Sequence, residues 1–312
     1  VHATSEEAEE QVSIGIEIYK KLFKKLALPY LLVKKPHWEL FPGAVAAFEF
    51  YTLLPDGKVT ETGSVNNLGQ AFSRVFNIKY EKADGSHEYA YQTCYGQSER
   101  LLASVVSIHG DDHGLVLPPS ISPMLVVIVP IMYAETVEKV ADYAKSIEKM
   151  LRRRGFAVVL DLRELTPGEK FYYWEKRGIP IRLEIGSKEA ESKTVTVVRR
   201  DTLEKETVHQ SEIFRVIRRK LQEIHRNMLK EAKKSLTASV SFASHLTGIT
   251  WRKRKKAIFK AYWCGDEECC NKIESETKMD IIGLAVKKKI GKRKRCIVCG
   301  EEAKEIVYIA KS

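Results

Sequence analysis

Apolar residues recur at helical spacing near the beginning of the chain and then give way to short alternating runs. The helical positions are Val12, Ile16, Tyr19, Phe23 and Leu26. This spacing predicts a helix that Pro29 ends. After it, turn sequences rich in Pro, Gly and Asp separate runs that predict strands of an antiparallel sheet over 44–54, 58–62, 78–82 and 88–95. Helices that cross this sheet are expected over 66–76 and 100–108.

The sequence after residue 120 has a different rhythm. Two continuous apolar runs of strand length, over 125–129 and 157–160, flank a helix predicted over 137–151. A shorter helix is expected over 169–177, strands over 179–185 and 194–199, and an amphipathic helix over 211–234. Strands that alternate with helices predict a small α/β domain with a partly parallel sheet.

The length of 312 residues corresponds to two or three domains. Pro118, Pro119 and Pro123 interrupt the chain and place the first boundary there. We therefore expect domains over 1–120, 121–234 and 235–312, in a multidomain protein of the α+β and α/β classes. The last segment is too small and polar to build a large core on its own.

The distribution of apolar residues and cysteines excludes several classes of protein. No run approaches the ~18 consecutive apolar residues of a membrane-spanning helix. The first residues have no secretory signal. Five of the six cysteines lie after residue 263, whereas a secreted disulfide scaffold would be shorter and more evenly rich in cysteine. We therefore expect a cytoplasmic protein.

Positive charge is concentrated in the last third of the chain. The net charge is +11, and residues 211–312 hold 25 Lys and Arg against 12 Asp and Glu, so the whole excess lies there. Such a region is typical of a surface that binds a polyanion, most often a nucleic-acid backbone, and a solvated basic face is the alternative. The densest run, 251–256, is expected to contact phosphates.

Four cysteines near the C-terminus have the spacing of a metal site. Cys264 and Cys269 form one close pair, and Cys296 and Cys299 form a second pair separated from the first by 26 residues. Four thiolates from two such pairs can surround one ion tetrahedrally, which suits Zn²⁺, with iron as the alternative. The basic residues before Cys296 would help to keep the thiols deprotonated. A closed site of this kind has a structural role, and Cys270 competes with Cys269 as a ligand.

Three further features have candidate chemistry. His109 and His113 are four residues apart, as in a zinc-binding helix, but Gly110 predicts a helix end that turns into a loop. No residue near Cys94 in the sequence indicates a general base, so Cys94 is expected to be a half-buried strand thiol. Arg100 follows Gly96 at a strand-to-helix junction, where a guanidinium can stack on a base or pair with phosphate, although a surface arginine is the alternative.

Several long motifs occur together along the chain. They include Leu-Gly-Gln-x-Phe at 68–72, Gln-Thr-Cys-Tyr-Gly-x-Ser-x-Arg at 92–100 and His-Gly-Asp-Asp-x-Gly-Leu-Val-Leu-Pro-Pro at 109–119. Others follow at 127–131, 166–175, 178–186 and 198–201. In this order they resemble archaeal-type prolyl-tRNA synthetases, which are class II aminoacyl-tRNA synthetases, over essentially the whole chain.

The resemblance implies a reaction, substrates and an architecture. The family joins proline to ATP, with Mg²⁺, releases pyrophosphate and transfers the prolyl group to proline tRNA. Residues 1–120 would be the second half of a class II catalytic domain built on an antiparallel sheet. Residues 121–234 would be an α/β anticodon-binding domain, and 235–312 a small α+β C-terminal domain that binds Zn²⁺. The family also suggests a homodimer with no membrane association.

The resemblance further implies which residues form each site. Arg100 matches the motif 3 arginine that contacts ATP, with Gly96, Ser98 and Gln70 beside it. The proline pocket would contain Phe41, Ser64, Asn66 and Cys94. Gly63, Ser64, Asn66 and Gly69 are expected in a loop and helix start that approach proline and ATP. The anticodon would meet Arg163, Lys170 and Glu175, and the metal would be held by Cys264, Cys269, Cys296 and Cys299.

The sequence also departs from the family. Val1 matches the tail of motif 2, so motif 1 and the motif 2 arginine are absent, and this chain alone is not expected to activate proline. The family's histidine before Leu-Gly-Gln is missing, and 45–48 is apolar where the family has a Thr-rich strand. The alternative function is a non-catalytic tRNA-binding paralogue with a degenerate active site. A generic zinc-stabilised nucleic-acid module would explain only 211–312.

Overall fold

The computed structural model describes residues 1–132, 135–252, 257–286, 290–291 and 293–312. These residues form two compact units. Unit 1 contains 1–24, 28–104 and 233–312, and unit 2 contains 25–27 and 105–232. Over the described ranges, no helix has both the length and the apolar character needed to cross a bilayer.

Unit 1 is built on one mixed sheet, whose described strands run in the order β12-β13-β15-β14-β1-β2-β3-β6. The strands from the first third of the chain are β1 (Leu31–Lys34), β2 (Ala46–Leu53), β3 (Val59–Gly69) and β6 (Gln92–Gln97). Those from the last quarter are β12 (Val240–Phe242), β13 (Ile258–Trp263), β14 (Asp280–Ala285) and β15 (Glu305–Ala310). The two groups join where β1 pairs antiparallel with β14, so the C-terminal segment extends a sheet that begins elsewhere in the sequence.

Gly283 allows β14 to approach β1. Its φ is +147°, and a Cβ built there would lie 2.7 Å from Cγ2 of Val33 and 3.0 Å from the carbonyl oxygen of Lys34. The register of β14 against β15 also shifts between Ile281 and Gly283. A side chain at 283 would therefore push the two strands apart.

We expect Gly283→Ala to lower the free energy of unfolding by about 2–3 kcal/mol, because a strained φ and a backbone clash are added together. Chemical denaturation measures the change. Gly248→Ala is the control, since its Cβ would meet no atom of the described residues within 4 Å and its φ is not positive. Equal stability of the two variants would contradict the assignment of Gly283.

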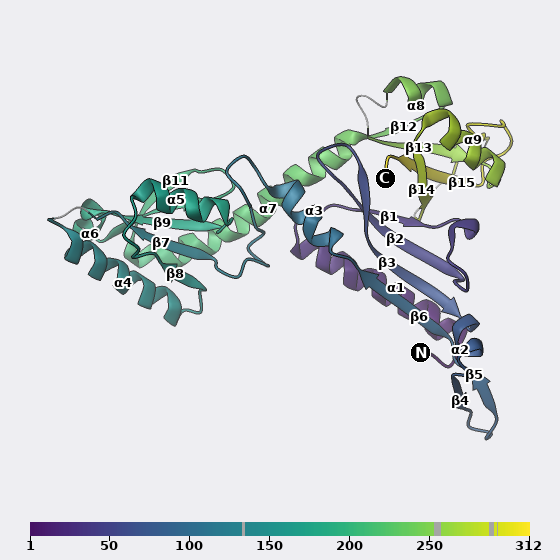
Figure 1. Ribbon diagram of the computed structural model, residues 1–312, viewed down its shortest axis with the longest axis horizontal. Helices are drawn as coiled ribbons and strands as arrows, with labels where there is room; N and C mark the ends of the chain where they lie inside the picture. Colours follow the sequence, from purple (N-terminus) through teal and green to yellow (C-terminus); the bar gives the residue numbers. More distant parts are fainter. Residues whose placement is uncertain (133–134, 253–256, 287–289, 292) are drawn as a thin grey trace. The chain divides into compact units, whose positions relative to one another are not determined.

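Helix α1 (Ser5–Lys25) packs on one face of the sheet (Figure 1). Its N-terminus is capped by Thr4, whose hydroxyl oxygen accepts a hydrogen bond from the amide of Glu7 at 3.2 Å. Phe23 is fully buried and stacks on Phe50 of β2, with ring centroids 5.2 Å apart. The predicted helix that ends before Pro29 is confirmed.

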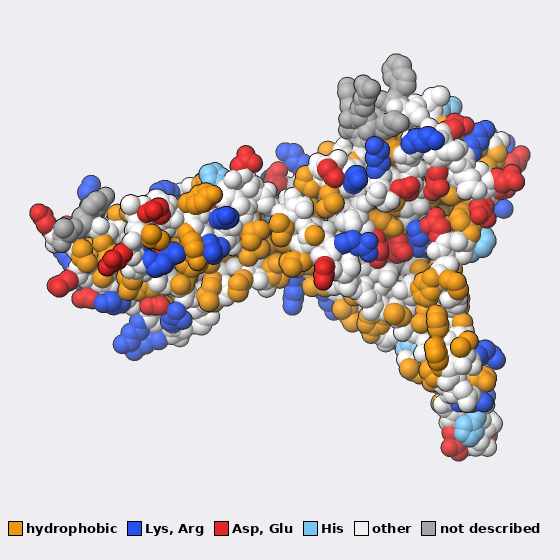
Figure 2. Space-filling model, in the orientation of Figure 1, with side chains coloured by type: hydrophobic (Ala, Val, Ile, Leu, Met, Phe, Trp, Pro, Cys, Tyr) orange, Lys and Arg blue, Asp and Glu red, His pale blue; other side chains and the backbone are white. Residues whose placement is uncertain are grey.

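The other elements of unit 1 are short. They are η1 (His37–Glu39), α2 (Ala71–Val75), the hairpin of β4 (Lys79–Glu81) and β5 (His87–Tyr89), α8 (Leu246–Arg252) and α9 (Glu267–Thr277). Helix α3 (Arg100–His109) begins in unit 1 and ends in unit 2. Figure 2 shows apolar side chains on the part of unit 1 next to the β4–β5 hairpin. The exposed apolar residues of unit 1 include Phe41, Val45, Val75 and Phe76.

Unit 2 is a three-layer α/β arrangement around a sheet whose described strands run β11-β10-β9-β7-β8. The strands are β7 (Val126–Pro130), β8 (Val158–Leu160), β9 (Ile181–Ile185), β10 (Thr194–Arg199) and β11 (Lys205–His209). The helices are α4 (Val137–Arg153), α5 (Pro167–Lys176), α6 (Ser187–Ser192) and α7 (Ile213–Ser239), and α7 continues into unit 1. Strand β7 is parallel to both neighbours, and β10 is antiparallel to both of its neighbours.

The alternation of side chains along β7 explains the layers. Val126 and Ile128 pack in one core with residues of α4 and α7. Val127 and Val129 face the other side and pack with Phe171 of α5. A strand with both faces buried reads as a continuous apolar run, which is the pattern in the sequence. The prediction of a partly parallel sheet is confirmed.

Two of the sequence-based elements are wrong. The helix expected over 66–76 is reduced to α2, because residues up to Gly69 belong to β3. The strand expected over 88–95 is divided between β5 and β6. Strands β1 and β11 and helix α6 were not expected from the sequence.

Candidate functional sites

The paired strands β3 and β6 place four of the expected site residues next to one another. Ser64 lies opposite Gly96, and Asn66 lies opposite Cys94. Because alternate residues of a strand share a face, these two cross-strand pairs lie on the same face of the sheet. The amide nitrogen of Asn66 donates to the Ser64 hydroxyl at 3.2 Å. The expectation that Gly63, Ser64, Asn66 and Gly69 lie in a loop and helix start is therefore wrong, since all four belong to β3.

The same strand pair has an open edge at β6. Cys94 is exposed rather than half-buried, so the expectation for its burial is wrong, although its place in a strand is confirmed. A Cβ at Gly96 would meet no atom within 4 Å in the part of the chain that the structure describes. The backbone of β6 is therefore free to be approached by a flat molecule at this point.

Arg100 is the first residue of α3, and two residues separate it from the end of β6. Its Nε donates to the Ser98 hydroxyl at 3.0 Å, and its Nη2 lies 2.7 Å from a carboxylate oxygen of Glu61. The side chain of Arg100 is still 54% exposed. It is held in place by two partners while one face of the guanidinium stays accessible, which suits stacking or anion binding.

Gln70 and Phe41 lie at the far end of β3 from Arg100. Gln70 is the residue before α2, and its amide donates to the carbonyl oxygen of Tyr89 at 2.7 Å. Glu61 and Gly69 are eight residues apart in β3, which corresponds to about 25 Å of strand. The structure therefore does not bring Gln70 to Arg100. Phe41 is exposed and packs against Phe72, with ring centroids 6.4 Å apart.

The His109–His113 segment is a helix end followed by a tight loop, as expected. His109 ends α3, and its Nε2 lies 3.2 Å from the carbonyl oxygen of Leu26. Burial lowers the pKa of His109. Asp111 accepts two hydrogen bonds from Arg200, at 2.7 and 2.6 Å, which fasten the loop to the end of β10. His113 Nδ1 lies 3.6 Å from a carboxylate oxygen of Glu175, so the two imidazoles have different partners, and the loop is structural.

Four cysteines converge in the C-terminal part of unit 1. Cys264 directly follows β13, Cys269 lies in the first turn of α9, and Cys296 and Cys299 lie in the turn before β15. Their four sulfur atoms all lie within 4.8 Å of one another. Sulfurs around a tetrahedral Zn²⁺ with bonds of about 2.3 Å would be about 3.8 Å apart, so the set fits such an ion with little adjustment.

The surroundings of these thiols differ. Burial raises the pKa of Cys264 and Cys269. Burial acts in the same direction on Cys296, but backbone amides around it outweigh that effect and hold its pKa below the usual range. The amide of Val298, for example, donates to the Cys296 sulfur at 3.5 Å. Amide donors of this kind stabilise a thiolate.

Cys270 is buried but points to a different group of side chains. Its sulfur and carboxylate oxygens of Glu39 and Glu274 lie within 4.8 Å of one another. Burial raises the pKa of Cys270 to about 12, which favours the neutral thiol. Of the two neighbouring cysteines in α9, the structure therefore places Cys269 in the four-cysteine cluster.

In unit 2, Asp161 organises the loop after β8. Its carboxylate accepts hydrogen bonds from Nε and Nη2 of Arg163, at 2.9 and 2.6 Å, and from Nε1 of Trp174 at 2.7 Å. Arg163 also lies over the ring of Tyr173, 3.9 Å from its centroid. Burial would raise the pKa of Asp161, but the hydrogen bonds from Arg163 and Trp174 outweigh it and hold the pKa at about 2.

This pKa predicts a pH-dependent contribution to stability. Because the folded-state pKa lies below the unfolded value of about 3.9, the contribution is present above pH 4 and is lost as the pH falls towards 2. We expect Asp161→Asn to cost about 2 kcal/mol at pH 7 and much less at pH 2.5. Urea denaturation of both proteins at the two pH values measures this. If the difference in unfolding free energy between the two proteins were the same at both pH values, the low pKa assigned to Asp161 would be contradicted.

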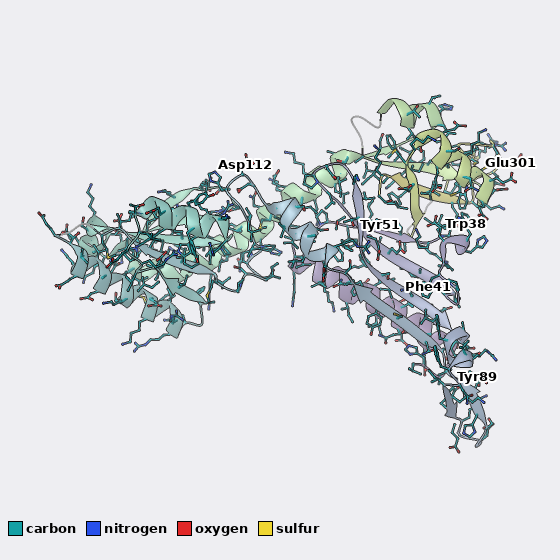
Figure 3. All side chains as sticks on the ribbon, in the orientation of Figure 1. Trp38, Phe41, Tyr51, Tyr89, Asp112 and Glu301 are labelled. Atoms are coloured by element: carbon teal, nitrogen blue, oxygen red, sulfur yellow. The ribbon has the colours of Figure 1, made fainter. Side chains whose placement is uncertain are left out.

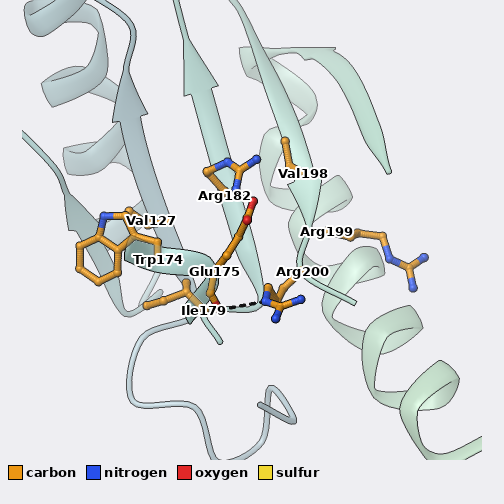
Figure 4. Close-up of a pocket in the computed structure, with 8 residues that line it drawn as sticks. All are labelled: Val127, Trp174, Glu175, Ile179, Arg182, Val198, Arg199 and Arg200. Carbon is orange, nitrogen blue, oxygen red and sulfur yellow. Dashed lines mark hydrogen bonds and ion pairs between the residues drawn. The ribbon is translucent and has the colours of Figure 1, made fainter. Parts of the chain in front are cut away.

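A pocket lies beside this loop on the sheet surface (Figure 4). It is lined by Val127, Trp174, Glu175, Ile179, Arg182, Val198, Arg199 and Arg200. Arg182 donates to a carboxylate oxygen of Glu175 at 2.6 Å and to one of Glu184 at 2.9 Å. The carbonyl oxygen of Glu175 accepts from Nε of Arg200 at 3.0 Å, the interaction dashed in Figure 4. Charged donors and acceptors thus meet an indole ring at this surface.

The three residues expected at the anticodon differ in exposure. The side chain of Arg163 is 40% exposed and that of Glu175 is 15% exposed. Lys170 is almost fully buried, and its ammonium group lies 3.3 Å from the carbonyl oxygen of Asp161. Lys170 therefore supports the loop from below. Of the expected phosphate-binding run 251–256, residues 253–256 lie outside the described residues.

The sequence alone did not reveal the part that Asp161, Arg182 and Glu184 take in this surface. A signal was present, because Arg182 and Glu184 are charged residues in the otherwise apolar run 179–185 and both are buried. Charges that are almost fully buried need partners. Arg182 is paired with Glu175 of α5, and Glu184 is paired with Lys205 of β11 at 2.8 Å. The spacing of residues in the sequence does not reveal these partners.

Comparison with known families divides the chain into three matching regions. Residues 1–109 match the tRNA synthetase class II core domain (G, H, P, S and T). Residues 125–220 match an anticodon binding domain. Residues 250–312 match a family described as prolyl-tRNA synthetase, C-terminal.

Individual relatives match over the whole chain. A proline–tRNA ligase of Methanopyrus kandleri is 41% identical over 311 residues, which cover 100% of this chain and 64% of the relative. That of Thermococcus kodakarensis is 40% identical over 321 residues and is covered to 66%. A crystal structure of prolyl-tRNA synthetase from Cryptosporidium parvum, complexed with L-proline and AMP, matches with a TM-score of 0.93 and 30% identity. It covers 100% of this chain, and this chain covers 66% of it.

Proposed function

Since the chain belongs to the prolyl-tRNA synthetase family, we propose that it is part of an enzyme that attaches proline to proline tRNA through a prolyl-adenylate. The chain spans 64% to 66% of the length of the curated relatives it matches, so the whole reaction is proposed for the full-length protein. The observation that carries the proposal is the whole-chain likeness to a synthetase described with L-proline and AMP.

In this proposal the ATP site lies at the junction of β6 and α3. Arg100 stacks on the adenine or pairs with phosphate, and its exposed guanidinium with two fixed partners supports that role. Ser98 orients Arg100, and the open space above Gly96 admits the nucleotide. Mg²⁺ would enter with the ATP phosphates, whose charge it and the arginine neutralise. Gln70 would act from a distance, by holding α2 against Tyr89.

The proline pocket is proposed on the neighbouring part of the sheet. Ser64, Asn66 and Cys94 offer small polar groups on one face of β3 and β6. Phe41 supplies an apolar wall for a side chain that has no hydrogen-bonding group of its own. The substrate's imino nitrogen and carboxylate are the groups that the polar residues would meet.

Unit 2 is proposed to read the anticodon through the surface around Asp161. Arg163 presents a guanidinium to a guanine O6 or N7, and Glu175 presents a carboxylate to a base amino group. Lys170 supports the loop that carries Arg163. The indole of Trp174 supplies a stacking surface in the same pocket.

The four-cysteine cluster is proposed to hold a structural Zn²⁺. Cys264, Cys269, Cys296 and Cys299 would complete a tetrahedral thiolate set, and the metal would tie β13, α9 and the turn before β15 together. A set of four protein ligands leaves no position for substrate, so the metal supplies stability.

We further propose the division into catalytic, anticodon-binding and C-terminal domains over 1–120, 121–234 and 235–312. A homodimeric, cytoplasmic enzyme is proposed on the family resemblance. The catalytic domain and the C-terminal domain would then share the sheet of unit 1.

Proline-dependent exchange of pyrophosphate into ATP by the full-length protein tests this function. We expect exchange that needs proline. Binding of proline tRNA without any exchange would instead select the non-catalytic paralogue, and absence of both would contradict the family-based function altogether.

A further inference from the structure

The chain between β1 and β2 carries Phe41 and is held at both of its ends. The amide of Lys35 donates to the carbonyl oxygen of Ala47 at 2.9 Å, and the amide of Val45 donates to that of Asn67 at 2.7 Å. Between these points lies η1, a single 3-10 turn that ends two residues before Phe41. No side chain caps the start of this turn. Between the two fixed ends, the contacts of its own side chains therefore help to set its position.

Those contacts come from the C-terminal part of unit 1. Trp38, in the middle of η1, packs on the core formed by β13, α9 and β15. Its ring meets that of Trp263 edge-to-face, with centroids 5.4 Å apart and an interplanar angle of 71°. Beside it, Lys35 pairs with Glu39 and donates to the carbonyl oxygen of Ile282 in β14 at 3.4 Å. Figure 3 shows Trp38 and Phe41 on this connection.

Trp263 is in turn fixed by the four-cysteine centre. It directly precedes Cys264, and it is 2% exposed. Its indole nitrogen donates to the carbonyl oxygen of Asp266 at 3.0 Å, and Asp266 caps the helix that carries Cys269. The backbone carbonyl oxygen of Trp263 accepts a hydrogen bond from the amide of Lys304 at 2.9 Å. These hydrogen bonds connect the Trp263 ring to the elements that carry Cys264 and Cys269.

We propose that Trp38 is a positioning residue of the proline pocket, which ties the place of Phe41 to the four-cysteine centre through Trp263. The inference rests on the proposed function of Phe41. It gives the C-terminal segment a role beyond its own stability. The edge-to-face contact between Trp38 and Trp263 holds a turn that no side chain caps, and Trp38 is three residues before Phe41, the wall of the pocket. An effect on Phe41 alone changes the binding of proline and leaves the ATP site at Arg100 intact.

The test uses pyrophosphate exchange by the full-length protein with Trp38→Ala and Trp38→Phe. For Trp38→Ala we expect the KM for proline to rise about fivefold, since an aromatic pair of this kind contributes roughly 1 kcal/mol beyond its buried area. The KM for ATP and kcat should change less than about twofold. Trp38→Phe keeps an aromatic edge and should recover most of the affinity for proline. A KM for proline that stays at the wild-type value, or equal losses in all three parameters, would overturn the proposal.

A second measurement does not depend on activity. Chelation of the metal should change the tryptophan fluorescence of the wild-type protein, and the change should be smaller in Trp38→Phe because the Trp38 contribution is gone. An identical change in both proteins would show that Trp38 does not follow the metal centre, and would overturn the proposal. If the wild-type protein showed no exchange at all, the proposed function would fail, while this fluorescence comparison would still decide the contact.

Discussion

Replacement of both Cys296 and Cys299 by serine is expected to remove about one equivalent of bound metal and to destabilise the protein strongly. The four sulfurs lie within 4.8 Å of one another and join three elements of unit 1. Because a structural metal binds the folded state alone, its binding free energy is folding free energy. We expect a loss of at least about 5 kcal/mol, or roughly 10–20 °C in melting temperature.

Metal analysis of the purified protein together with thermal unfolding measures both effects. Cys94→Ser is the matched control, since Cys94 is exposed on β6 and far from the cluster in the sheet order. Cys270→Ser separates the two neighbouring cysteines of α9, and it should keep the metal while Cys269→Ser loses it. A native protein without metal, or a double serine variant as stable as the wild type, would contradict the assignment.

Arg100→Ala is expected to lower proline-dependent pyrophosphate exchange by about 10²–10³-fold. Transition-state charge on the phosphates is stabilised by positioned donors, and loss of one such donor typically costs this much. Arg100 is prepared for the task because Ser98 and Glu61 already hold its guanidinium at 3.0 and 2.7 Å. Initial rates of exchange at saturating and limiting ATP measure the effect on kcat and on KM.

Two further variants sharpen this result. Arg100→Lys keeps the charge but loses the planar fork, so it should recover only a small part of the activity if stacking and two-point contact matter. Arg152→Ala is the control for the loss of an exposed arginine, since Arg152 is exposed to a similar degree and pairs with Glu148 within α4 of unit 2, whereas Arg100 belongs to unit 1. Full activity of Arg100→Ala would remove Arg100 from the ATP site.

Elements with strong local signals were predictable from the sequence. Helices α1, α4 and α7 show regular apolar spacing over many residues, and their buried positions match it. The convergence of two close cysteine pairs also followed from spacing alone. The choice between Cys269 and Cys270 did not, because adjacent residues of a helix point about 100° apart, and only tertiary packing decides which one faces the cluster.

Elements that depend on partners far away in the sequence were not predictable in this way. The stretch around Asn66 has apolar residues at helical spacing, but it pairs with Ala47 on one side and Cys94 on the other. Those two ladders override the local preference. The resemblance named Gln70 as part of the ATP site but could not show that β3 carries it to the end opposite Arg100.

A structure of the full-length protein with proline and a non-hydrolysable ATP analogue tests the proposed ATP site most directly. We predict that the adenine or the phosphates contact the Arg100 guanidinium above Gly96, with proline beside Phe41 and the polar face of β3 and β6. A nucleotide bound elsewhere on the molecule, with the Arg100–Glu61 pair undisturbed and exposed, would contradict this assignment.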